Sequence, residues 1–104
     1  MTILLTNDDG IAAPGLNALY KEISKSYPVK VVAPESEQSA VGHAITIHNP
    51  LRVKKFFQGE KFFGYAVSGT PADCVKIAVK AIMEEPPKLV ISGINFGANI
   101  GTNL

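Results

Sequence analysis

Two adjacent carboxylates, Asp8 and Asp9, follow the apolar run Ile3-Leu4-Leu5 near the start of the chain. Neighbouring carboxylates repel each other unless a cation or a proton lies between them. Hard divalent cations such as Mg²⁺ and Mn²⁺ prefer oxygen ligands from carboxylates, amides and hydroxyls. Asp-Asp-Gly on its own is more typical of a turn. Its position directly after a predicted buried strand, together with two other polar clusters, favours a metal site.

Those two clusters also follow predicted strands. One runs from Ser36 to Ser39 and the other from Asn95 to Asn103. Ser39 and Asn95 can complete an oxygen ligand set with Asp8 and Asp9, so these four residues are the predicted metal ligands. A single site is a simpler explanation of the three clusters than chance.

The last cluster contains glycines and asparagines that recur at intervals of four, at 93, 97 and 101 and at 95, 99 and 103. Glycine lets the backbone approach an anion, and successive N–H groups can hold a phosphate. A flexible surface loop is the alternative. No Walker A sequence and no strand-linked G-x-G-x-x-G run occurs. The candidate phosphate-binding residues are Ser39, Asn95, Gly97, Asn99 and Gly101.

Other reactive side chains carry weaker indications. His43 could donate a proton beside a phosphate, but His43 and His48 flank a predicted strand and could equally pack there or face solvent. Cys74 reads as a small buried residue rather than a nucleophile. The segment 68–73 could direct backbone amides toward a phosphate, or could only cap a helix. The four phenylalanines at 56, 57, 62 and 63 suggest core or oligomer contacts more than base stacking.

The elements that position these residues alternate between strands and helices. The pattern predicts strands at Ile3-Leu5, 29–33 and 89–91, all buried on both faces. A helix opens at Pro14, and a second opens at Thr70 with Pro71 at its first position. Residues 45–47, 51–53 and 62–67 are short β-prone pieces, with a turn at 58–61.

This order predicts an α/β fold, a three-layer α/β/α Rossmann-like sheet that is mostly parallel, with a possible β-hairpin excursion. Open sheets of this kind bind ligands at the carboxyl ends of their strands. All three polar clusters follow such ends.

Composition limits the remaining possibilities. The chain has 104 residues, enough for one domain, and a formal net charge of +1. So small a net charge does not favour a nucleic-acid polymer or a membrane as partner. The single cysteine, the absence of an export signal and the lack of a long apolar run lead us to expect a cytoplasmic protein.

Four segments together resemble the stationary-phase survival protein SurE family. They are Thr6-Asn7-Asp8-Asp9-Gly10, Ala33-Pro34 with Gln38-Ser39, Ser68 through Val75, and Ser92-Gly93-Ile94-Asn95 with Gly97, Asn99 and Gly101. The resemblance implies a 5′(3′)-nucleotidase that hydrolyses nucleoside monophosphates, in some members with activity on short polyphosphate. It also implies one divalent cation per subunit, Mg²⁺ or Mn²⁺, held by Asp8, Asp9, Ser39 and Asn95.

The chain is shorter than members of that family, so we expect residues 1–104 to be the N-terminal portion of a SurE-like nucleotidase domain. The family also implies a homodimer or homotetramer at full length. Asp8 and Asp9 are the predicted catalytic residues, with Asp9 either attacking directly or one of the pair orienting a water. The alternatives are a phosphohydrolase that prefers polyphosphate and, for this chain, a non-catalytic metal- or nucleotide-binding module.

Overall fold

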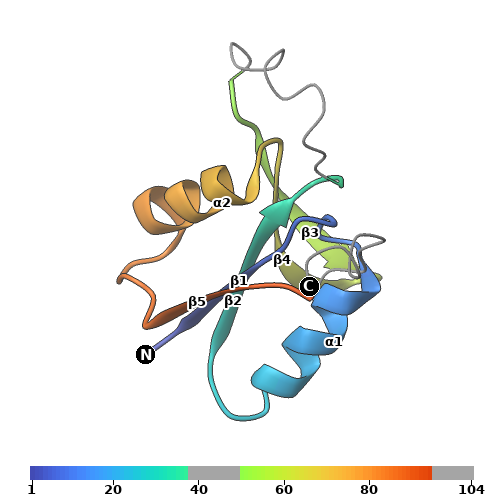
Figure 1. Cartoon of the computed structure of the whole chain (residues 1–104), viewed down its shortest axis with the longest axis vertical. Helices are drawn as coiled ribbons and strands as arrows, with labels where there is room; N and C mark the ends of the chain where they lie inside the picture. The colour runs from blue at the N-terminus through green and yellow to red at the C-terminus, as the bar shows by residue number, and fades with distance from the viewer. Residues whose placement is uncertain (38–49, 95–104) are drawn as a thin grey trace, which may run out of the picture.

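The computed structural model describes residues 1–37 and 50–94 of the chain, which form one sheet with helices on both faces (Figure 1). The elements in chain order are β1 (Ile3–Thr6), α1 (Pro14–Ile23), β2 (Val29–Pro34), β3 (Val53–Gln58), β4 (Lys61–Val67), α2 (Pro71–Ile77), the π-helical turn η2 (Ala78–Ile82) and β5 (Leu89–Ser92).

The five strands lie in the order β3-β4-β2-β1-β5. β4, β2, β1 and β5 run parallel to one another, and β3 pairs antiparallel with β4. The prediction of a mostly parallel α/β sheet is therefore confirmed. The hairpin is also present, although β4 is no excursion, because it pairs with β2 inside the main sheet.

The two faces of the sheet are covered by different helices, as the alternation of side chains along a strand requires. Leu5, Val31 and Ala33 point to the face that packs against Leu16 of α1. Their neighbours point the other way, into a second cluster that includes Cys74 and Ala78. The two clusters confirm the three predicted layers, with α1 and α2 on opposite sides in Figure 1.

Both helices begin where the sequence predicts. Pro14 occupies the first turn of α1, where a backbone N–H group would have no partner within the helix, so its absence costs no hydrogen bond. In α2 the Thr70 side chain accepts a hydrogen bond from Asp73 N, and the Asp73 carboxylate accepts one from Thr70 N. This reciprocal pair satisfies two N–H groups that the helix itself cannot bond.

A β-bulge in the hairpin separates the aromatic side chains. Phe56 pairs with Gly64 and Phe57 pairs with Phe62, so Phe63 is the extra residue on β4. Phe63 is buried against Tyr20 of α1, with their ring centroids 5.1 Å apart. Phe57 and Phe62 are both exposed. The expectation of core contacts thus holds for Phe63, and for the partly buried Phe56 beside it.

The prediction that residues 89–91 form a strand is correct, but the prediction that this strand is buried is wrong. Leu89 is 52% exposed and Val90 is 42% exposed. β5 lies at the edge of the sheet beyond β1. A strand in the centre of a sheet is covered by a neighbouring strand on each side. Among the described residues, β5 has a neighbour on one side only, so its apolar residues stay exposed.

Candidate functional site

The loop after β1 is closed by the side chain of Asn7. Asn7 is fully buried, its Nδ2 donates to Gly10 O at 2.9 Å, and its Oδ1 accepts from Gly10 N at 3.2 Å. Asp8 and Asp9 lie between these two residues, with Asp8 exposed and Asp9 half-buried. The strand therefore ends in a tied turn that presents two carboxylates.

Gly10 joins this turn to the segment after β2. Its φ of +107° favours glycine, and an added Cβ would lie 3.2 Å from Ser36 C and 3.3 Å from Glu37 N. Ile11 N also donates to Pro34 O at 2.8 Å. The Asp8-Asp9 turn thus lies directly against the start of the second polar cluster.

The segment after β5 reaches the same place. Thr6 pairs with Ser92, and Gly93 N donates to Thr6 O at 3.0 Å. The carbonyl oxygen of Ile94 lies against Gly15, in the first turn of α1, where a Cβ would overlap it. The described residues that lead into the second and third polar clusters therefore lie at the carboxyl end of β1, where the first cluster begins.

Gly15→Ala is expected to displace the segment that leads into Asn95. The new methyl group would collide with Ile94 O, so either this segment or the start of α1 must move. If Asn95 is a metal ligand, affinity for Mn²⁺ should fall by roughly tenfold or more. Titration calorimetry on a longer protein containing this chain would measure it. Ala12→Gly, which changes an exposed residue before the same helix, is the control and should bind as the parent does.

Two of the predicted site residues are described and the others are not. Asp8 and Asp9 stand at the convergence of the three segments. Ser39, Asn95, Gly97, Asn99 and Gly101 lie outside the described residues, as do His43, His48 and the predicted strand at 45–47. Of the described residues that lead into these segments, Ser36 and Glu37 lie against Gly10, and Ile94 lies against Gly15.

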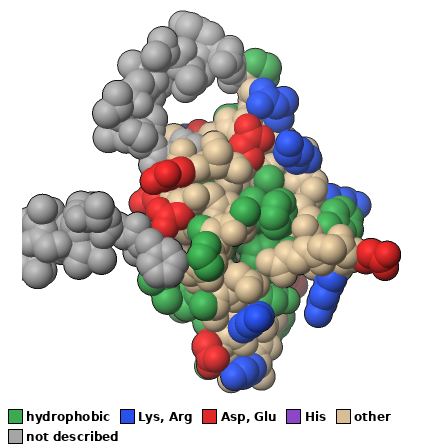
Figure 2. Space-filling model, turned by 90° about the vertical axis from the view of Figure 1, so that its right-hand side faces the viewer, with side chains coloured by type: hydrophobic (Ala, Val, Ile, Leu, Met, Phe, Trp, Pro, Cys, Tyr) green, Lys and Arg blue, Asp and Glu red, His purple; other side chains and the backbone are tan. Residues whose placement is uncertain are grey.

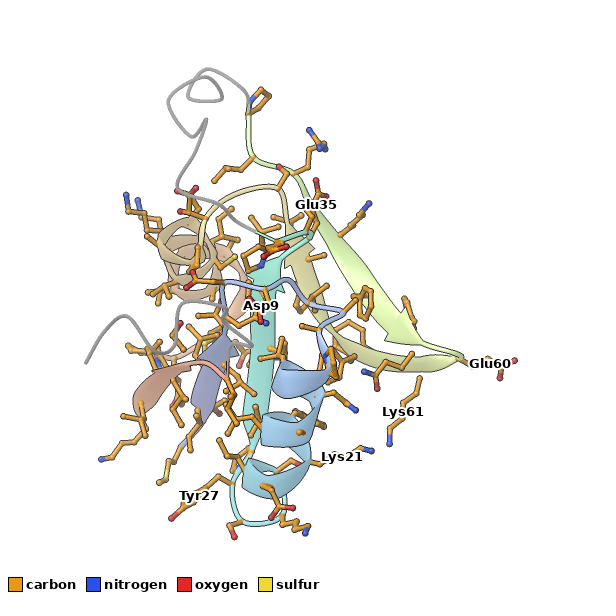
Figure 3. All side chains as sticks on the ribbon, turned by 45° about the vertical axis from the view of Figure 1, so that its right-hand side comes forward. Asp9, Lys21, Tyr27, Glu35, Glu60 and Lys61 are labelled. Carbon is orange, nitrogen blue, oxygen red and sulfur yellow. The ribbon has the colours of Figure 1, made fainter. Side chains whose placement is uncertain are left out.

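The topology makes this edge the expected ligand crevice. The chain leaves β1 through α1 on one face of the sheet and arrives at β5 from α2 on the opposite face. β1 and β5 are adjacent, so the connection that leaves β1 and the connection that enters β5 lie on opposite faces of the sheet at this point. Open α/β sheets bind ligands outside the carboxyl ends of strands at such a switch point. Asp9 lies at this end of the sheet, whereas Glu60 and Lys61 mark the hairpin turn away from it (Figure 3).

Negative charge is concentrated at this end. Asp8, Asp9, Glu35 and Glu37 follow β1 and β2 within four residues of the strand ends, and acidic side chains gather in the upper part of the face in Figure 2. Glu35 is paired with Arg52 Nη2 at 3.3 Å and with Lys54 Nζ at 3.9 Å. These two cations offset the charge of Glu35, and the adjacent carboxylates of Asp8 and Asp9 are the pair that favours a bound cation.

The donor chemistry fits a hard divalent cation. Residues 1–37 and 50–94 contain no group of three or more His, Cys, Asp or Glu side chains placed to share a metal ion. Asp8 and Asp9 are oxygen donors of the kind that such a cation prefers, and a hydroxyl at Ser39 and an amide at Asn95 would add neutral oxygen donors.

Segment 68–73 is used for capping. Thr70 N donates to Asp73 Oδ2 at 3.0 Å, and Ser68 exchanges hydrogen bonds with the backbone of Arg52. An added Cβ at Gly69 would lie 2.7 Å from Asp73 Oδ2, so the cap fills the space beside this backbone. These contacts support the capping interpretation over phosphate binding.

Cys74 is a buried core residue, as predicted. Burial, opposed by a side-chain interaction with Thr6 and aided by the Asp73 carboxylate, raises the pKa of its thiol to about 12. Thr6 Oγ1 itself is buried without a hydrogen bond of regular geometry among the described residues. A thiol with so high a pKa is not a thiolate nucleophile at neutral pH.

Two residues that shape the site, Asn7 and Gly15, were not among the predicted site residues, although Asn7 to Gly10 was predicted to form a turn. Asn7 closes the turn through its side chain. The pattern that indicates this role is an asparagine at a strand end with a glycine three residues later, because Asn side chains there commonly bond nearby backbone groups. Gly15 admits the Ile94 carbonyl, and no local pattern indicated that contact.

The fold and the site together define an open α/β protein with acidic residues at the switch point, which is where sheets of this kind bind ligands. A family model described as "Survival protein SurE" matches residues 3–104, and the chain belongs to this family. No helix in the described part of the chain has the length and hydropathy that crossing a membrane requires.

Individual relatives are similar over the whole chain. A protein of Syntrophobacter fumaroxidans named 5′-nucleotidase SurE is 59% identical over 104 residues, covering 100% of this chain and 42% of its own length. One of the same name from Syntrophus aciditrophicus is 61% identical, covering 100% of this chain and 39% of its own length. The chain therefore spans about two-fifths of the length of these relatives.

A solved structure has the same fold. The crystal structure of the SurE protein from Aquifex aeolicus superposes with a TM-score of 0.78 and 44% sequence identity, over 95% of this chain and 39% of that one.

Proposed function

We propose that this chain carries the metal-binding part of a phosphomonoesterase that hydrolyses nucleoside 5′- and 3′-monophosphates to nucleoside and phosphate. The observation that carries the proposal is the convergence of three strand-end segments around Asp8 and Asp9. The names of the relatives, 5′-nucleotidase SurE, support the choice of substrate.

In this proposal Asp8, Asp9, Ser39 and Asn95 hold one Mg²⁺ or Mn²⁺ per subunit. The cation, when bound, offsets negative charge on the phosphate as the phosphoester bond breaks. Asp9 either attacks phosphorus or, with Asp8, orients and deprotonates the attacking water. Backbone N–H groups near Asn95, Gly97, Asn99 and Gly101 hold the phosphate oxygens, with Ser39 beside them.

The proposal extends to the setting of the enzyme. We place it in the cytoplasm, where nucleoside monophosphates are available, and we expect a homodimer or homotetramer for a protein of the relatives' length. No nucleic-acid polymer or membrane is required, because the formal net charge of +1 provides no general attraction to either.

The test is phosphate release from a panel of nucleoside monophosphates and short polyphosphate, with Mg²⁺, Mn²⁺ or EDTA. It should be run on this chain and on a longer protein that contains it. We expect metal-dependent release from mononucleotides by the longer protein. Faster release from polyphosphate would favour the polyphosphatase alternative. Metal and nucleotide binding without release by either protein would contradict the proposal and favour a binding module.

A further inference from the structure

Asn7 is a buried polar residue beside the candidate site that has no assigned role. Its side chain is fully buried at the end of β1, and both ends of its amide bond to Gly10. The two hydrogen bonds, at 2.9 and 3.2 Å, close a turn of four residues that contains Asp8 and Asp9. These bonds therefore restrain the backbone that carries the two carboxylates.

The bonding pattern at this position requires an amide. Gly10 offers a carbonyl oxygen, which needs a donor, and an N–H group, which needs an acceptor. Asparagine supplies both from one short side chain. Aspartate has the same shape and keeps the acceptor, but when ionised it has no donor for Gly10 O. Alanine supplies neither, and each loss leaves a buried backbone group without its partner.

The side-chain hydrogen bonds of Asn7 both go to Gly10, at the other end of the turn. What its bonds fix is Gly10, and Gly10 in turn lies against the backbone of Ser36 and Glu37. The tied turn thus sets the two carboxylates in a fixed place relative to the second strand-end segment.

We propose that Asn7 is a positioning residue, which holds Asp8 and Asp9 in the arrangement that binds the divalent cation. The inference rests on the proposed metal site, but it goes beyond the ligands to the group that aims them. Groups that orient metal ligands through hydrogen bonds commonly change metal affinity by about tenfold to hundredfold when they are removed.

The experiment measures Mn²⁺ binding by titration calorimetry in a longer protein that contains this chain. Asn7→Ala is expected to raise the Kd for Mn²⁺ by about tenfold to hundredfold. The fall in phosphate release should be largely reversed by excess Mn²⁺, with the KM for the nucleotide unchanged. Excess metal also favours the folded state of an unfolded variant, so circular dichroism of the metal-free Asn7→Ala protein must match that of the parent for the higher Kd to be assigned to positioning.

Asn7→Asp gives a second and sharper test, because it keeps the shape of the side chain. An added negative charge alone would tighten cation binding. Loss of the donor to Gly10 O should loosen it, so we expect a higher Kd despite the extra charge. Asn17→Ala is the matched control, since Asn17 bonds Gln58 on the face of α1 and no residue of the turn. It should leave the Kd unchanged.

The two hypotheses fail in different ways. If the parent protein binds Mn²⁺ and both Asn7 variants bind it within threefold as tightly, Asn7 does not position the ligands and the metal site stands. Tighter binding by Asn7→Asp would also overturn the inference, because charge and not geometry would then dominate. If the parent itself binds no divalent cation, the proposed function and the inference are both wrong.

Discussion

Asp9→Asn should lower metal-dependent phosphate release by roughly 10³-fold, since several kcal/mol of transition-state stabilisation depend on the cation and each 1.36 kcal/mol is a factor of ten. The substitution removes a charge without changing the size of the side chain. The turn should keep its shape, because the two hydrogen bonds between Asn7 and Gly10 that close it are retained. Phosphate release at saturating Mn²⁺ from a longer protein containing this chain would measure the loss.

Asp73→Asn is the matched control for that experiment. Asp73 lies in the α2 cap, where its Oδ2 accepts from Thr70 N, and an amide oxygen can accept the same bond. Its rate should stay within threefold of the parent, and the far-ultraviolet circular dichroism of both variants should match that of the parent. Near-normal turnover by Asp9→Asn would rule out a catalytic or ligand role for this carboxylate.

Leu4→Ala is expected to have the largest effect on stability, about 2–5 kcal/mol. Leu4 lies fully buried in β1, between the neighbouring strands and α2, where it packs with Val32, Val67 and Cys74. Truncation removes apolar contacts and leaves a cavity that a strand bonded on both sides cannot easily close. Urea unfolding of a longer protein that contains this chain, followed by circular dichroism, would measure the change.

The control is Leu51→Ala, the same substitution at a residue that is 41% exposed. It should lower the free energy of unfolding by about 1 kcal/mol or less, because less apolar surface leaves the interior. An equal loss at both positions would show that burial within this sheet is not what makes Leu4 important.

Much of the fold follows from local sequence. Leu16, Leu19, Tyr20 and Ile23 mark one face of α1, and the structure packs these residues against the sheet. Thr70 and Asp73 predict the start of α2 because their side chains bond backbone groups within the same turn. Interactions over three or four residues depend little on the rest of the chain, which is why such patterns can be read directly.

The errors arise where distant residues decide the outcome. Leu89 and Val90 have the composition of a central strand, but their burial depends on what lies beside β5. Phe62 and Phe63 are adjacent and chemically identical, yet the bulge opposite Phe56 sends one into the core and leaves the other exposed. Strand register is set by pairing partners, so hydropathy alone could not separate them.

The candidate site divides in the same way. The sequence by itself determined which donor groups are available and so predicts a hard cation, because two adjacent carboxylates at a strand end, with hydroxyl and amide groups after other strands, suit such an ion whatever the fold. Only the tertiary structure decided that the segments meet, through Gly10 against Ser36 and Gly15 against Ile94. Donor type is a property of single residues, whereas convergence depends on parallel strands aligning their carboxyl ends across the sheet.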